Sequence, residues 1–312
     1  MLRKKAGSSV PGADPRDISR PGWQAAAKRT FSGISEHNIP LISAGVAFYG
    51  MLAIFPALTA LIAVYGLVAD PADIQQLLQA GVLPPGVADL LQGHAQSLAG
   101  PNSGALSISV IIGFLLTLWS ARQGANAIIK ALNVVYGEGE NRSFLRRIGL
   151  SLALTAASIV FAVLALIAVI LIPSMLGQLA LGPMWQLGIS AIRWPILAVL
   201  IGGGVAALYR YAPNRHRPAW RWVVLGAAVA TVLWLIGSGL FSLYVSHFAN
   251  YNKSYGSLGT IVVLLLWLFI SALIVLIGAE LNSAVEQQVA IEADIAEDKQ
   301  DKGRRREPRQ RP

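Results

Sequence analysis

The sequence contains no cysteine, and few of its residues are charged. Without cysteine, disulfide bridges and thiolate metal sites are excluded. Charged residues make up 13% of the 312 residues, against roughly 25% in an average soluble domain. Hydrophobic residues make up 54%. The chain therefore has the composition of a membrane protein.

Sequence signals for catalysis are also missing. A nuclease or another hydrolase needs metal ligands or an acid and base pair gathered at one water-exposed place. The four histidines are instead spread along the chain, at His37, His94, His216 and His247. No glycine-rich phosphate loop of the P-loop type is present. We therefore expect no enzyme, no cofactor and no metal, and no ATP-driven transport by this chain alone.

Six apolar blocks are each long enough to cross a bilayer, which takes about 20 helical residues. Lipid offers no partner to an unpaired backbone group, so each block is predicted to be a helix. The predicted fold class is an all-α polytopic membrane protein, a bundle of six transmembrane helices. The blocks are 41–68, 105–136, 148–176, 184–209, 222–246 and 258–284.

Lysine and arginine alternate between the two predicted sides of the membrane. Seven precede the first block, none lies in 69–104, and the later short loops alternate in the same way. Basic residues near helix ends are retained in the cytoplasm, so both termini are predicted to be cytoplasmic. The net charge of +9 is then explained by topology and by anionic headgroups of the lipid bilayer, and no nucleic-acid partner is expected.

The rest of the chain divides around the predicted spans. Residues 1–22 are predicted to be a disordered cytoplasmic tail, 23–285 the six-span membrane domain, and 286–312 a charged cytoplasmic tail that ends as a frayed helix and then disorder. Within the membrane domain, 22–35 has the pattern of an amphipathic helix at the cytoplasmic interface. The segment 70–103 is predicted to be an outer amphipathic loop.

One polar stripe interrupts the apolar pattern of the second block. At about 100° per residue its members fall within an arc of roughly 80°. Ionisable residues inside a span are costly and usually face the bundle interior or a water-filled cavity. The stripe is therefore a candidate cavity or substrate path. Its members are Trp119, Arg122, Asn126, Lys130 and Asn133.

Alternatives stay open along this stripe. Arg122 indicates a cavity or a buried pair, whereas Lys130 and Asn133 either line the same cavity or lie beyond the hydrocarbon. Glu280 is a candidate counter-charge, closer in depth to Lys130 than to Arg122, or else it meets water at the interface. Asn282 lies two residues on and points the opposite way.

Tyr49 is a further path candidate, in the first block. It lies seven residues before Pro56 and shares its helix face. Proline interrupts helical hydrogen bonding, so a kink is predicted there. Such a kink serves either as packing or as a gate.

Four stretches resemble the YihY/BrkB family of bacterial inner-membrane proteins, in order and with similar spacing over about residues 23–285. They are AFYGMLAIFPALTALIAVYG at 47–66, LWSARQGANAIIKALNVVYGEGENRSFLRR at 118–147, LYRYAPN at 208–214 and NYNKSYGSLGTIVVLLLWLFISALIVLIGAELN at 250–282. The resemblance implies a multi-pass protein of the inner membrane with six spans and both ends inside. The family's characteristic polar positions fall at Arg122, Asn133, Tyr255, Gly256, Glu280 and Asn282.

Two classes of function remain. Family members have carried the labels ribonuclease BN and virulence factor, but neither activity follows from these residues. The first class is a transporter or lipid-handling protein, in which the stripe attracts a small anionic solute or headgroup. The second is a non-transporting membrane scaffold whose tails recruit partners. The oligomeric state is open, since an apolar exterior suits a monomer or a dimer equally.

Overall fold

The computed structural model describes residues 18–68, 119, 122–166, 183–216, 218–248 and 257–306. Helices are the only regular structure in these ranges. This confirms the all-helical class for the described part of the chain. Residues 1–17 of the predicted disordered tail at 1–22, the outer loop at 70–103 and the first part of the second block at 105–118 lie outside it.

The helices begin close to the predicted starts, because long apolar runs leave little freedom in where a helix lies. Helices α2, α8, α9 and α11 begin within two residues of the predicted starts at 41, 184, 222 and 258, whereas α6 begins four residues before 148. A further helix covers 122–135. The bounds are α1 Arg20–Glu36, α2 Ile39–Val68, α6 Phe144–Leu166, α8 Pro183–Tyr211, α9 Trp220–Phe248 and α11 Ser257–Arg306.

Three described helices are long and apolar enough to cross a membrane, over Phe144–Phe161, Trp220–Ser246 and Ile261–Asp298. A fourth candidate is the pair Arg20–Glu36 and Ile39–Ile54, which are bent by 62° relative to each other. The apolar part of α8, Pro195–Tyr211, is shorter. These helices identify a membrane protein, whereas the count of six spans and the cytoplasmic termini stay predictions.

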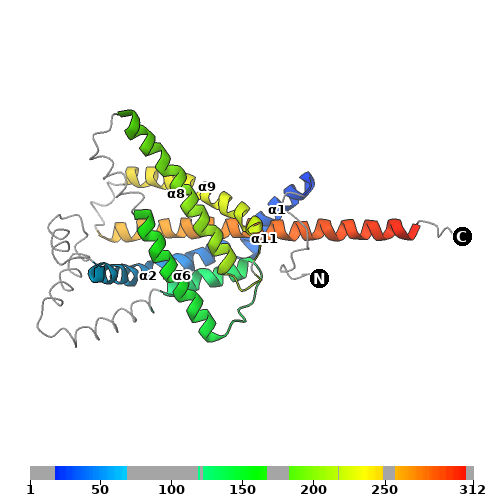
Figure 1. Ribbon diagram of the computed structural model, residues 1–312, viewed down its shortest axis with the longest axis horizontal. Helices are drawn as coiled ribbons and strands as arrows, with labels where there is room; N and C mark the ends of the chain where they lie inside the picture. Colours follow the sequence, from blue (N-terminus) through cyan, green and yellow to red (C-terminus); the bar gives the residue numbers. More distant parts are fainter. Residues whose placement is uncertain are drawn as a thin grey trace, which may run out of the picture. The chain divides into compact units, whose positions relative to one another are not determined.

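The contacts divide the chain into two compact units. One contains Met1–Val46, Ile128–Arg142 and Ala165–Pro312, and the other contains Ala47–Ala127 and Ser143–Leu164. In the first unit α9 packs against α8 and α11, and α1 packs against α11 (Figure 1). Its most deeply buried large side chains include Tyr209, Val223 and Leu276.

Helices α9 and α11 approach closely at two glycines. A Cβ atom on Gly226 would overlap the carbonyl oxygen of Gly278, and a Cβ atom on Gly278 would lie 2.7 Å from the Gly226 carbonyl oxygen. Farther along the same two helices, the Trp234 and Trp267 rings meet edge to face at 5.8 Å, and Trp234 Nε1 donates to Ser271 Oγ. Small residues are a common device for close helix packing in membranes, where lipid removes the hydrophobic driving force.

Helix α1 covers α11 with a face of small side chains. Its buried residues are Gly22, Ala26, Thr30 and Gly33, and Ser19 caps its N-terminus by accepting from the Gly22 N–H. Trp23 and Phe31 are exposed on other faces, with 73% of Phe31 accessible. The helix predicted at 22–35 is confirmed, although it begins at Arg20 rather than after the predicted disordered tail. Its place at the membrane interface stays a prediction.

The tail after residue 285, predicted to end as a frayed helix and then disorder, is helical as far as residue 306. Helix α11 has 50 residues, a length of about 75 Å at 1.5 Å per residue, which exceeds the roughly 30 Å of a bilayer core. Alanine, glutamate, glutamine and lysine, all good helix formers, dominate its last part. Contact with α1 and an Asp298–Lys302 pair at 2.6 Å also stabilise it. In Figure 1, α11 continues well past α1 toward the C-terminus.

Candidate functional site

The Arg122 end of the stripe lies in the second unit. The Arg122 guanidinium stacks on the Trp119 ring, with its carbon 3.7 Å from the ring centroid. This contact follows from helical spacing, since residues three apart share a face. Arg122 Nε is buried and has no hydrogen-bond partner in the described residues. The result is an oriented cation with an unused donor.

The helix that carries Arg122 packs closely on α2. A Cβ atom on Gly124 would lie 3.1 Å from the Ala53 Cβ and 3.6 Å from the Gly50 Cα. Tyr49 belongs to the same part of α2, is 45% exposed and meets Phe48 edge to face at 5.5 Å. Asn126 is half-buried. Trp119, Arg122, Asn126 and Tyr49 thus lie in one unit, whereas Pro56 has no described side chain.

The Lys130 and Asn133 end of the stripe differs in burial and in its contacts. Lys130 is exposed, whereas Asn133 is buried and both ends of its amide are engaged. Its Nδ2 donates to Glu140 Oε2 at 2.9 Å, and its Oδ1 accepts from the Asn214 N–H at 2.7 Å. These bonds give Asn133 a structural role, because it ties the loop after its own helix to the loop after α8.

The same two loops are joined by further hydrogen bonds. Arg142 donates from Nη1 to the Ala212 carbonyl at 3.0 Å and from Nη2 to the Pro213 carbonyl. Asn214 Nδ2 donates to the Gly139 carbonyl at 2.7 Å. Loops have few other means of fixing their backbone, so side-chain bonds of this kind decide their conformation.

Replacing Asn133 with alanine is expected to lower stability by about 1–3 kcal/mol, because the Asn214 N–H and Glu140 Oε2 lose the hydrogen bonds that the Asn133 amide makes with them. The thermal unfolding midpoint of the purified protein measures this. Asn133→Asp is the informative companion, since it keeps the acceptor for Asn214 but places a second carboxylate against Glu140. An Asn133→Ala protein as stable as the wild type would contradict the assigned role.

Glu280 finds a partner that sequence reasoning did not consider. Its Oε2 lies 2.9 Å from His37 Nδ1, and the residue is only 4% exposed. The hydrogen-bond partner of Glu280 in the described residues is therefore His37 rather than Lys130 or Arg122. A Cβ atom on Gly33 would overlap Glu280 Oε1, so the carboxylate rests directly on the backbone of α1.

Asn282 faces a different helix, as its spacing from Glu280 predicts. Its Oδ1 accepts from the Gly226 N–H at 2.7 Å and its Nδ2 donates to the Val223 carbonyl at 3.3 Å. Both partners belong to α9, whereas the partner of Glu280 follows α1. The two polar side chains therefore do not line one cavity.

A second buried ion pair was also missed. Arg215 Nη1 donates to Glu286 Oε2 at 2.7 Å, and the guanidinium stacks on the Tyr136 ring at 3.8 Å. The Arg215 side chain is only 4% exposed. Its Nε and Nη2, Glu286 Oε1 and the Tyr136 hydroxyl make no hydrogen bond within the described residues. An arginine in a basic loop gives no sequence signal of such burial.

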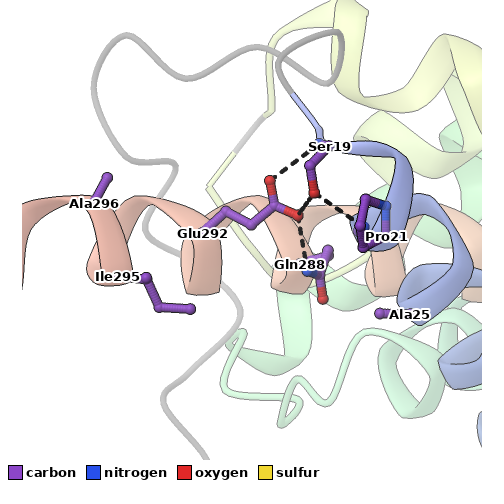
Figure 2. Close-up of a pocket in the computed structure, with 8 residues that line it drawn as sticks. Ser19, Pro21, Ala25, Gln288, Glu292, Ile295 and Ala296 are labelled. Atoms are coloured by element: carbon purple, nitrogen blue, oxygen red, sulfur yellow. Dashed lines mark hydrogen bonds between the residues drawn. The ribbon is translucent and has the colours of Figure 1, made fainter. Parts of the chain in front are cut away.

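A shallow groove of about 490 Å³ lies where the start of α1 meets α11 (Figure 2). Glu292 accepts from the Ser19 N–H at 3.1 Å and the Ser19 hydroxyl at 2.9 Å, while Gln288 Nε2 donates to the same carboxylate. Glu292 therefore acts as an anionic cap at the N-terminus of α1. The groove has an apolar lining of alanine, proline and isoleucine around this polar centre.

Two of the family's characteristic positions and the expected absence of a metal site depend on which residues the structure describes. Tyr255 and Gly256 lie outside the described residues. Among the residues that the structure describes, no group of histidine, aspartate and glutamate is arranged to hold a metal ion.

Long apolar helices, small-residue contacts and buried pairs between helices define a helical membrane protein. A family model described as virulence factor BrkB matches residues 30–303, and the chain belongs to this family. The resemblance stated from the four sequence stretches is thereby confirmed.

Relatives with known names support the same assignment. The ribonuclease-like protein YfkH of Bacillus subtilis is 33% identical over 84% of this chain and 95% of its own length. The UPF0761 membrane protein IL2447 of Idiomarina loihiensis is 31% identical over 69% of this chain and 73% of its own length. A UPF0761 membrane protein of Albidiferax ferrireducens is 23% identical over 85% of this chain and 63% of its own length. No solved structure matches.

Proposed function

We propose that this protein transports or handles a small anionic solute or an anionic lipid, with Arg122 as its anion-binding group. The observation that carries the proposal is the buried Arg122 Nε, which has no hydrogen-bond partner in the described residues. A donor of a cation that is buried without a partner is costly, and an anion bound to it would offset that cost. The Trp119 ring holds the guanidinium in one orientation, which suits recognition of a planar carboxylate or a phosphate.

The same proposal includes the topology and location. We place the protein in the bacterial inner membrane with six spans and both termini in the cytoplasm. The alternation of basic and base-free loops supports this orientation. Residues 1–22 and 286–312 are then cytoplasmic tails of a membrane domain at 23–285. The basic residues on that side contact anionic headgroups.

A membrane scaffold is the second candidate, and the length of α11 favours it. After Ala284 the helix continues for 22 residues to Arg306, which is about 33 Å at 1.5 Å per residue. A rigid charged helix of this kind can present a docking surface to a cytoplasmic partner. In that case Arg122 is packed, and no solute reaches it.

Cysteine accessibility separates the two candidates, and the natural absence of cysteine leaves no background. Trp119, Arg122 and Asn126 are replaced one at a time by cysteine and exposed to a membrane-impermeant thiol reagent in intact cells and inverted vesicles. Transport predicts labelling at these three positions, because water must reach the path of an anionic solute.

Two matched positions control the experiment. Ile128 lies on the opposite face of the same helix and should stay unlabelled. Lys302, whose side chain is 69% exposed in the charged tail, should label only in inverted vesicles if that tail is cytoplasmic. If Lys302→Cys labels but no stripe position does, the stripe is dry and the transport proposal fails.

A further inference from the structure

The His37–Glu280 pair is a buried titratable cluster at a joint between helices. The side chains are 17% and 6% exposed, respectively, and their atoms approach to 2.9 Å. His37 is the C-cap of α1, and its backbone N–H donates to the Gly33 carbonyl at 2.9 Å. Asn38 follows with a φ of 50°, and α2 begins at Ile39. The pair therefore fastens the bend between α1 and α2 to α11.

Two further ionisable groups of the described residues interact with the pair. Glu36 on α1 and Tyr136 after the helix 122–135 interact electrostatically with Glu280. Neither is a cation. With His37 neutral, the pair carries one net negative charge in a buried place, which is unfavourable.

One proton resolves this imbalance. When His37 donates its Nδ1–H to Glu280, the free Nε2 can take up a proton, and the result is an imidazolium–carboxylate pair with no net charge. Histidine is the side chain that ordinarily changes charge between pH 5 and 8. Protonation of His37 also strengthens its hydrogen bond to Glu280, because both the donor and the acceptor are then charged. Proton uptake should therefore tighten the attachment of α1 to α11.

We propose that His37 and Glu280 bind the proton that this protein moves together with its anionic solute. The proposal rests on the proposed function, because it names the coupling ion. Helix α2 connects the two groups along the chain. Helix α2 begins two residues after His37 and continues to Gly50 and Ala53, which pack on Gly124, two residues from Arg122. A proton with a monovalent anion would also make the transport cycle electroneutral.

Hydrogen exchange at α1 tests the proton site without any solute. Exchange of the backbone amides at 33–37 is measured by mass spectrometry on the full-length protein in detergent at pH 6 and pH 8.5, corrected for the pH dependence of chemical exchange. An amide exchanges when the helix end opens, and the stronger His37–Glu280 bond at pH 6 should make this opening rarer. The protection of these amides should therefore be about tenfold higher at pH 6 than at pH 8.5. Amides of α9 serve as the internal reference.

Three variants make the result specific. His37→Gln keeps a hydrogen-bond donor for Glu280 but cannot take up a proton, so protection at 33–37 should become independent of pH. Glu280→Gln keeps an acceptor without the charge and should have the same effect. His216→Gln removes an exposed histidine of the loop after α8 and should retain the full tenfold change. A pH response that persists in His37→Gln, or that is absent from the wild type, overturns the proton site.

A second arm distinguishes failure of the coupling from failure of the proposed function. The Asn126→Cys protein is labelled in inverted vesicles at both pH values, with rates normalised to a free thiol. Coupling predicts that the labelling rate changes with pH and that His37→Gln abolishes the change. Labelling that is equal at both pH values overturns the coupling while transport survives. If Asn126→Cys labels at neither pH, both the transport proposal and the coupling fail. The exchange experiment still decides whether His37 and Glu280 bind a proton.

Discussion

Replacing Arg215 with alanine is expected to destabilise the protein by about 3–5 kcal/mol, because Glu286 is left as a charge without its buried partner. Arg215 Nη1 and Glu286 Oε2 lie 2.7 Å apart, and the arginine side chain is 4% exposed. Stacking on Tyr136 is lost as well. The measurement is the thermal unfolding midpoint of the purified protein, together with the fraction that elutes as a single species in size-exclusion chromatography.

Two controls identify burial as the cause. Lys302→Ala removes the cation of the Lys302–Asp298 pair, whose side chains are 69% and 61% exposed, respectively. This variant should leave the unfolding midpoint within error of the wild type. The double variant Arg215→Leu/Glu286→Leu removes both charges and should recover most of the lost stability. Equal effects of Arg215→Ala and Lys302→Ala would show that the pair contributes no more than a surface contact.

Replacing Gly226 with alanine is expected to cost about 3 kcal/mol, the upper part of the usual range for overpacking. The added Cβ would overlap the Gly278 carbonyl oxygen and the Asn282 side chain. A backbone oxygen cannot rotate away, so α9 and α11 must separate and the Gly226–Asn282 hydrogen bond must lengthen. The expected result is a lower unfolding midpoint and a lower yield of folded protein.

Gly239 provides a matched control on the same helix. A Cβ at that position would meet no atom within 4 Å. Alanine has a higher helix propensity than glycine, so Gly239→Ala should be neutral or slightly stabilising. If both variants lose the same stability, the close approach of α9 and α11 does not explain the effect of Gly226→Ala.

The helices could be predicted from the sequence because their signal is local. A continuous apolar run has to be a helix in lipid, and its ends are marked by polar residues. The length of α11 could not be predicted, because the amino acids after residue 285 suit a solvated tail as well as a helix. What decides between the two is contact with α1, through Ser19 and Glu292, which no local pattern contains.

The candidate site was predicted less completely. Helical spacing correctly places Arg122 beside Trp119, since residues three apart on one helix must share a face. The same spacing extends the stripe to Asn133, whose amide is instead engaged by two loops. Periodicity shows which side of a helix a residue occupies. It does not show what lies opposite.

The sequence by itself determined the class of the molecule, the places where its helices begin and the family to which it belongs, because composition, apolar run length and motif order are properties of the linear chain. Only the tertiary structure decided the partners of the buried charges. His37 and Glu280 are 243 residues apart, and Arg215 and Glu286 are 71 apart. A charge takes whichever opposite charge or dipole the packing brings within about 3 Å, and that packing depends on close contacts such as Gly33 against Glu280.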